Sequence, residues 1–220
     1  MTALVISQDR PWTRQLINSL DNEEHEIFYS SLISQELIEN IGPDWIFFFH
    51  WSEIVPKTIY KNYKCCVIHT GNLPKARGGS PLQNQILEGV TDTQVNIIEM
   101  SGEIDAGGIY CSAPISLQGS ITDIWLSIAD VTSNLINFCM SANPKAAPQR
   151  GKSQTYKRIK NNSVNFNIEK PLSFVYDQIR MVDDDFYPKC HLDINGFRLE
   201  FSRAKLKTDK ILADVTITKK

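Results

Sequence analysis

The residues best suited to do chemistry in this sequence are a histidine and an aspartate that each follow an apolar run. His69 ends the run "CCVIH", and Asp105 lies in "SGEIDAGGIY", shortly after a run that ends near Met100. An imidazole can relay protons near neutral pH, and a carboxylate beside it can orient it and stabilise its charged form. If the two runs are neighbouring strands, the pair predicts a proton-transfer site. A lone histidine at such a place more often forms a single structural hydrogen bond.

The segment after His69 has the composition of a loop that borders a ligand. Its sequence, "TGNLPKARGGS", contains few bulky apolar side chains. Gly71, Gly78 and Gly79 let the backbone approach a bound group, and a helix that begins at Pro81 would present free amides to negative charge. Ligands of open parallel sheets bind beyond the carboxyl ends of the strands. We therefore expect a crevice beside His69.

Together these motifs carry a resemblance to a known family. The segments "HTGNLP", "RGGSP" and "IDAGGI", with "GPDWIFFFHWSEIVP" and "AAPQRGKSQTYKRI", cover most of residues 43–160. This pattern resembles the formyltransferases that use 10-formyltetrahydrofolate, which act on methionyl-tRNA, glycinamide ribonucleotide or sugar nucleotides. The resemblance implies a Rossmann-like domain with an Asn-x-His pair and an aspartate. His69 and Asp105 match that pattern, whereas Val67 stands where the family has asparagine.

The resemblance implies a catalytic role for His69 and Asp105, with 10-formyltetrahydrofolate as co-substrate. An amine would attack the formyl carbon, and the resulting oxyanion would need hydrogen-bond donors. Loss of one such donor typically costs about 2.7 to 4 kcal/mol, so something must substitute at Val67. Asn72 in the loop and Asn84 one turn inside the next helix are candidates. We expect Asn84, because a helix holds a side chain more rigidly than a loop; the alternative is that Asn84 caps the helix or faces solvent.

Other residues are expected to bind the co-substrate. Arg77, Gly78 and Gly79 would meet an anionic group of the folate or a phosphate, although a loop arginine is often only a surface residue. His50 and Trp51 follow an apolar run and would line the pterin pocket, with core packing as the equal alternative.

Short apolar runs alternate with amphipathic stretches, which is typical of a mostly parallel sheet with crossover helices. The expected strands are "TALVIS", "HEIFYS", "WIFFFH", "KCCVIH" and "TQVNIIEM". Helices are expected to open at Pro11, Ser34, Pro56 and near Ser80, and a long one to span residues 120–142. The predicted class is α/β with a Rossmann-like formyltransferase domain. No GxGxxG follows the first strand, so NAD and FAD are not expected.

The sequence predicts three parts: a catalytic domain at 1–144, a linker at 145–162 and a small α+β module at 163–220. The segment 143–162, which includes the linker, has two prolines and six basic residues, and Gln149 and Tyr156 are expected to position it. The module combines a helix in "PLSFVYDQIRMV", a hairpin around Asn195–Gly196 and a last strand in "ILADVTIT". His191 at the hairpin is expected to be structural. An exposed hairpin edge makes a homodimer possible.

Composition limits the kinds of protein to which this chain can belong. Of the 220 residues, 42% are hydrophobic and 22% are charged, as in ordinary globular proteins. The five cysteines include no CxxC pair, so we expect reduced core thiols and no metal site. No apolar run is long enough to span a bilayer, which favours a cytoplasmic protein without a membrane partner. Residues 145–220 hold sixteen Lys and Arg against nine Asp and Glu, which indicates either an anionic partner or attraction between the two halves.

The expected acceptor is the amine of a nucleotide-linked amino sugar, in the biosynthesis of a surface glycan such as lipopolysaccharide. Few residues follow the linker, and "IRMVD" and "LEFSRA" resemble the short C-terminal modules of sugar-type formyltransferases. Nucleic acid is therefore not the expected partner. Two alternatives stay open: a methionyl-tRNA formyltransferase, and a non-catalytic protein that binds folate or a sugar nucleotide.

Overall fold

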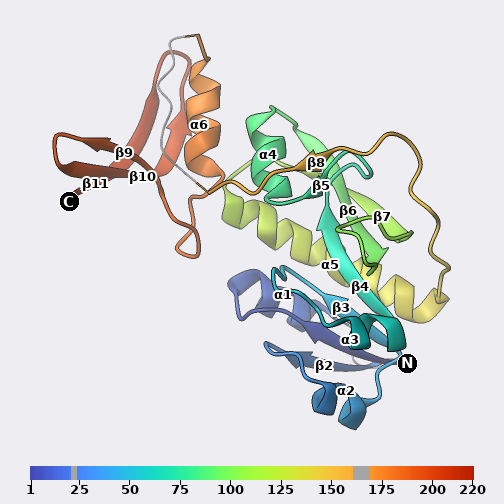
Figure 1. Ribbon diagram of the computed structural model, residues 1–220. Helices are drawn as coiled ribbons and strands as arrows, with labels where there is room; N and C mark the ends of the chain where they lie inside the picture. Colours follow the sequence, from blue (N-terminus) through green and yellow to red (C-terminus); the bar gives the residue numbers. More distant parts are fainter. Residues whose placement is uncertain (21–23, 161–168) are drawn as a thin grey trace. The chain divides into compact units, whose positions relative to one another are not determined.

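The computed structural model describes residues 1–20, 24–160 and 169–220 of the chain (Figure 1). Two compact units interleave along the sequence. The first comprises residues 1–78, 92–115 and 125–155, and the second residues 79–91, 116–124 and 156–220. The end of the expected linker, 161–162, and the start of the expected module, 163–168, lie outside the described residues. The three-part division expected from the sequence stays a prediction.

The first unit is built on a six-stranded sheet with the order β2-β1-β3-β4-β6-β7 (Figure 1). Its strands are β1 (Thr2–Ile6), β2 (Glu26–Ser30), β3 (Trp45–Phe48), β4 (Cys65–Thr70), β6 (Asp92–Glu99) and β7 (Ile109–Ser116). β1 to β4 pair in parallel, and β6 pairs antiparallel to β4. Two short strands, β5 (Arg77–Gly78) and β8 (Thr155–Tyr156), lie outside this sheet.

Helices cover the sheet because its central parallel strands, β1 and β3, are buried on both faces. These helices are α1 (Pro11–Ser19), α2 (Gln35–Ile41), α3 (Lys57–Asn62) and α5 (Ile121–Ala142). On one face, Ile38 of α2 and Ile59 of α3 join a buried cluster with β-strand residues such as Leu4. On the other face, Trp12 of α1 stacks on Trp125 of α5 with ring centroids 5.6 Å apart. The side chain of Ser34 caps α2 by accepting from the amide of Leu37.

The predicted α/β class is confirmed, together with the five strands expected in the sheet. The strand β7 was not predicted, because "IYCSAPIS" mixes small, polar and apolar residues and contains a proline. β7 can contain a proline and polar residues because it lies at the sheet edge. An edge strand needs fewer backbone donors and packs on fewer neighbours.

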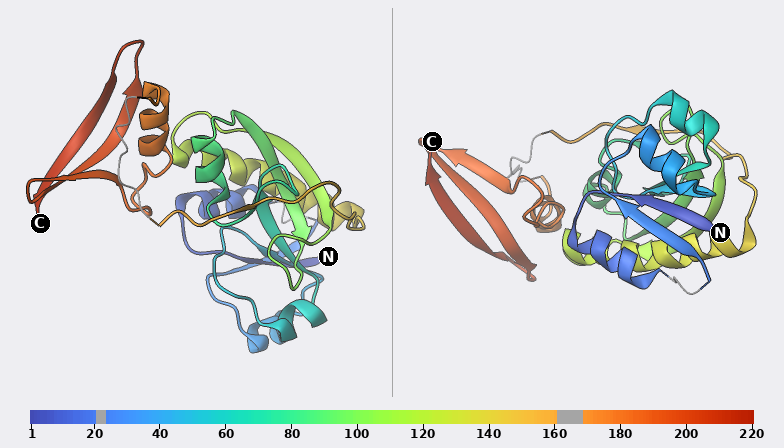
Figure 2. Two further views of the ribbon diagram at one scale, coloured as in Figure 1. Left: turned by 45° about the horizontal axis from the view of Figure 1, so that its top comes forward. Right: turned by 90° about the horizontal axis from the view of Figure 1, so that it is seen from below.

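The second unit contains α4 (Pro81–Leu87), α6 (Leu172–Arg180) and a three-stranded antiparallel sheet. The sheet has the order β11-β10-β9, with β9 (Cys190–Ile194), β10 (Phe197–Leu206) and β11 (Ile211–Lys219). Asn195 and Gly196 join β9 to β10 with φ angles of 48° and 79°, as a tight hairpin turn requires. α6 packs along β10, visible in both views of Figure 2. Among the described residues, no helix is both long and apolar enough to cross a membrane.

Candidate active site

β4 brings His69 to the end of the sheet in a buried position. The residue is only 5% exposed, and its Nε2 lies 2.6 Å from the carbonyl oxygen of Ala76. A carbonyl oxygen can only accept, so Nε2 carries a hydrogen and Nδ1 is the remaining site for proton exchange. The loop turns tightly here: a Cβ on Gly71 would lie 2.5 Å from the Cβ of Ala76. Glycine is therefore required for the approach of Ala76 to the imidazole.

Asp105 reaches His69 by a route that the sequence did not indicate. Because β6 runs antiparallel to β4, its last residue, Glu99, pairs with Cys66 rather than with the end of β4. The β6–β7 loop returns along β4, and Asp105 adopts a positive φ of 51° within it. Its Oδ2 lies 3.4 Å from Nδ1 of His69 and accepts a hydrogen bond of 2.9 Å from the amide of Gly78. The expected convergence of His69 and Asp105 is thus present, with Gly78 as the anchor of the carboxylate.

Gln149, in the segment after α5, hydrogen-bonds both the loop of Arg77 and the loop of Asp105. Its Oε1 accepts from Nε and Nη2 of Arg77, at 3.0 and 2.7 Å. Its Nε2 donates to the carbonyl oxygens of Asp105 and Gly107, at 2.8 and 2.9 Å. Two of the N–H groups of Arg77 are therefore directed at Gln149. Gln149 was expected only to position the linker, yet it connects Arg77 to the backbone of Asp105.

Asn96, a residue that the sequence did not single out, supports His69 from the neighbouring strand. It is 2% exposed and stands opposite His69 in the pairing of β4 and β6. Its Nδ2 donates to the carbonyl oxygens of His69 and Gly71, at 3.1 and 2.8 Å, and its Oδ1 accepts from Oγ of Ser112 at 2.7 Å. A polar residue inside the apolar run "VNIIEM" was the one available signal.

His50 and Trp51 follow β3 at the same end of the sheet. His50 has a φ of 48°, and its Nδ1 accepts from Nε1 of Trp12 at 3.3 Å. Its ring lies 4.3 Å from that of Trp125. The indole nitrogen of Trp51 is buried, and no residue of the described chain accepts its hydrogen. Trp51 thus presents a donor that a bound polar group can satisfy.

Asn84 and Gly79, both expected at the site, belong to the second unit. The Nδ2 of Asn84 donates to the carbonyl oxygens of Gly79, Ser80 and Lys157, at 2.9 to 3.0 Å. These bonds use both amide hydrogens to fix the start of α4 against the chain near Lys157. The oxyanion donor expected at Asn84 therefore lacks a free N–H, and its role in this structure is to hold the backbone.

Comparison with known proteins assigns the chain to a family. Residues 161–218 match the family described as the methionyl-tRNA formyltransferase C-terminal domain. The structure of "Methionyl-tRNA formyltransferase from Clostridium thermocellum" superposes with a TM-score of 0.94 at 30% identity and covers 100% of both chains. A methionyl-tRNA formyltransferase of Bacillus velezensis is 28% identical over 73% of this chain and 53% of its own. The chain thus spans about half the length of that curated relative.

The expected sugar-nucleotide acceptor is wrong, because the curated relatives from Bacillus velezensis, Bacillus licheniformis and Ehrlichia canis are all methionyl-tRNA formyltransferases. A sugar N-formyltransferase from a Shewanella species shares 16% identity at a TM-score of 0.68, with 92% of this chain and 96% of that chain covered. At that identity the likeness shows the fold alone. The match at 30% identity over the whole of both chains leads to one conclusion: the chain belongs to the formyltransferase family.

Proposed function

We propose that this protein transfers a formyl group from 10-formyltetrahydrofolate to the amino group of methionyl-tRNA. The observation that carries the transfer chemistry is the buried contact of His69 Nδ1 with Asp105 Oδ2, at 3.4 Å. Relatives named methionyl-tRNA formyltransferases support the acceptor.

The proposed chemistry uses the two nitrogens of His69 differently. The Nε2–H is held by the carbonyl oxygen of Ala76, which fixes the ring plane. Nδ1 faces the carboxylate of Asp105, so a proton placed on Nδ1 gains an acceptor. When the amine attacks the formyl carbon, one N–H proton must leave the nitrogen and the carbonyl oxygen becomes negative. The carboxylate of Asp105 accepts that proton and passes it to Nδ1 of His69, which it faces, and the charged imidazolium then stabilises the negative oxygen.

Several features of the first unit fit a folate beside His69. The buried indole N–H of Trp51 lacks an acceptor among the described residues, and a carbonyl or ring nitrogen of a pterin could accept from it. His50 and Trp51 follow β3, the strand next to β4, so they lie at the same sheet end as His69. Arg77 and Gly78 contribute indirectly, through Gln149 and through the carboxylate of Asp105.

A tRNA acceptor also agrees with the charge distribution. Residues 145–220 hold sixteen Lys and Arg against nine Asp and Glu. Phosphate contacts by Lys and Arg dominate nucleic-acid affinity and make it strongly dependent on salt. We therefore assign the excess of basic residues to contacts with the tRNA backbone.

The test is formyl transfer from 10-formyltetrahydrofolate to methionyl-tRNA, with free methionine and an amino-sugar nucleotide as comparison acceptors. We expect turnover with methionyl-tRNA alone and a KM that rises steeply between low and moderate salt. His69→Asn and Asp105→Asn should each lower kcat by about 10² to 10⁴-fold, the usual worth of a positioned acid or base.

The matched control is Asp209→Asn, which changes the same charge in an exposed turn of the second unit and should leave kcat unchanged. If a folded protein that binds the folate formylates none of these acceptors, the transferase proposal is contradicted. Equal turnover of methionine and methionyl-tRNA would contradict the acceptor but leave the transfer chemistry standing.

A further inference from the structure

Two cysteine thiols lie in contact in the first unit, away from the contacts of His69 and Asp105. Cys111 is in β7 and Cys139 is in α5, and their sulfur atoms are 3.5 Å apart. The sequence predicted only reduced core cysteines. The structure adds a contact between two thiols, one in the edge strand β7 and one in α5, that the sequence did not predict.

The pair is accessible from one side only. Cys111 is half-buried and lines an open, mainly apolar pocket of about 410 Å³. The other lining residues come from β7 and α5: Ser112, Ala113, Val131, Asn134, Leu135 and Phe138. Cys139 is fully buried behind Cys111. A small neutral oxidant that enters this pocket meets Cys111 first.

Exposure gives the two thiols different roles. Their contact lowers the pKa of Cys111 below the ordinary value for a thiol, and the Cys111 sulfur also lies 3.8 Å from the carbonyl oxygen of Leu135, to which its thiol can donate. The same contact between the thiols, with burial, raises the pKa of Cys139. The thiolate is the reactive form of cysteine. Because Cys111 borders the pocket and Cys139 is fully buried, Cys111 is the attacking thiol, and Cys139 is the partner that reacts with the sulfur electrophile formed beside it.

We infer that Cys111 and Cys139 are a redox pair that a peroxide converts into a disulfide. The Cys111 thiolate attacks one oxygen of hydrogen peroxide, which forms an S–O bond and breaks the O–O bond. The hydroxide released takes a proton and leaves as water. The sulfur of Cys139 then attacks the sulfenic acid, which forms the S–S bond, breaks the S–O bond and releases a second water with the Cys139 proton. Two sulfur atoms are oxidised, and both peroxide oxygens are reduced.

The remaining cysteines provide an internal comparison. Cys65, Cys66 and Cys190 are buried, and burial raises the pKa of Cys65 and Cys190 to about 12 and that of Cys66 well above its ordinary value. None of them has a lowered pKa. They should stay reduced while Cys111 and Cys139 react.

The sequence makes the test direct, because residues 78–145 contain no Lys or Arg before Lys145 and form one tryptic peptide. That peptide carries Cys111 and Cys139 and no other cysteine. The whole protein is treated with hydrogen peroxide under native conditions, then denatured, alkylated, digested without reductant and analysed by mass spectrometry. We expect this peptide to be unalkylated and two hydrogens lighter, and to become doubly alkylated after treatment with dithiothreitol.

Two variants separate the steps of the reaction. Cys139→Ser should leave Cys111 as a sulfenic acid that a cyclic 1,3-diketone probe traps. Cys111→Ser should slow oxidation of the peptide by about tenfold or more, since only the buried thiol remains. Cys190→Ser is the control and should oxidise like the unmodified protein. The inference is overturned if the peptide stays doubly alkylated while Cys65, Cys66 or Cys190 is oxidised, or if Cys139 joins Cys66 instead.

Discussion

The side-chain amide of Asn96 donates a hydrogen bond to the carbonyl oxygen of His69, the residue directly opposite it in the antiparallel pairing of β4 and β6. The same amide nitrogen holds the carbonyl oxygen of Gly71, where the chain leaves the sheet. Both contacts are buried. One side chain thus fixes the backbone on both sides of Thr70, directly after the imidazole that faces Asp105.

Replacement of Asn96 by alanine should therefore affect both stability and turnover. Two carbonyl oxygens and the hydroxyl of Ser112 lose a buried partner, which should lower the free energy of unfolding by about 2 kcal/mol. Because the backbone of His69 is then free to shift, kcat for the proposed transfer should fall more than KM changes. Urea unfolding and initial-rate kinetics measure the two effects. Asn40→Ala, at an exposed position of α2, should leave both unchanged.

The sequence could predict the sheet because its strands are short apolar runs with turn residues between them. It could also predict His69 and Asp105, through a motif. It could not predict Asn96 or Gln149, since each acts through backbone carbonyls of residues far away in the chain. Such contacts leave no local pattern. The antiparallel direction of β6 was equally hidden, because an apolar run has the same composition in either direction.

Gly107 should tolerate no side chain. A Cβ at this position would overlap the carbonyl oxygen and carbon of Glu99, at the start of the loop that carries Asp105. These are backbone atoms and cannot rotate away, so Gly107→Ala should cost about 3 kcal/mol of unfolding free energy. The measurement is the urea midpoint of the variant.

Gly102 provides the control for that substitution within the same loop. It is exposed, and the nearest atom to an added Cβ is the hydroxyl of Tyr60 at 3.9 Å. Gly102→Ala should unfold like the original protein. A large loss in Gly102→Ala, or none in Gly107→Ala, would contradict the tight approach of the loop to Glu99.

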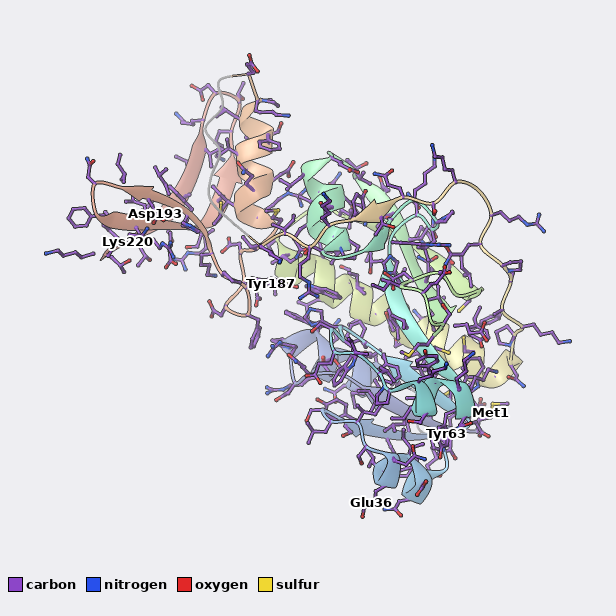
Figure 3. All side chains as sticks on the ribbon, in the orientation of Figure 1. Met1, Glu36, Tyr63, Tyr187, Asp193 and Lys220 are labelled. Atoms are coloured by element: carbon purple, nitrogen blue, oxygen red, sulfur yellow. The ribbon has the colours of Figure 1, made fainter. Side chains whose placement is uncertain are left out.

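Asp193 should make the free energy of unfolding of the second unit depend on pH in the acidic range. The guanidinium of Arg198 and the ammonium of Lys220 bond its carboxylate and hold its pKa well below the ordinary value. Asp193 and Lys220 are labelled in Figure 3. A carboxylate with a lowered folded-state pKa stabilises the protein above the pKa of the unfolded chain. This contribution is lost as the pH falls through the lower folded-state value.

The difference in urea midpoint between the original protein and Asp193→Asn should therefore be constant from about pH 7 to pH 5 and shrink below about pH 4. Because the ion pairs are exposed, added salt should also reduce it. Asp209→Asn should show no such difference at any pH. A midpoint difference that grows as the pH falls would have the wrong sign for this interaction.

Val67 offers a gain-of-function test of the proposed transfer chemistry. It stands two residues before His69 in β4, and because side chains alternate along a strand, both point to the same face of the sheet. The family pattern has asparagine here, whereas the amide of Asn84 is bound to three carbonyl oxygens. If the oxyanion lacks a donor at this point, Val67→Asn should raise kcat by about 10²-fold. Val67→Leu, similar in size but without an N–H, should not. An unchanged kcat in a folded Val67→Asn protein would mean that other donors already stabilise the oxyanion. The backbone amides of the loop that follows His69 would then be the next candidates for that role.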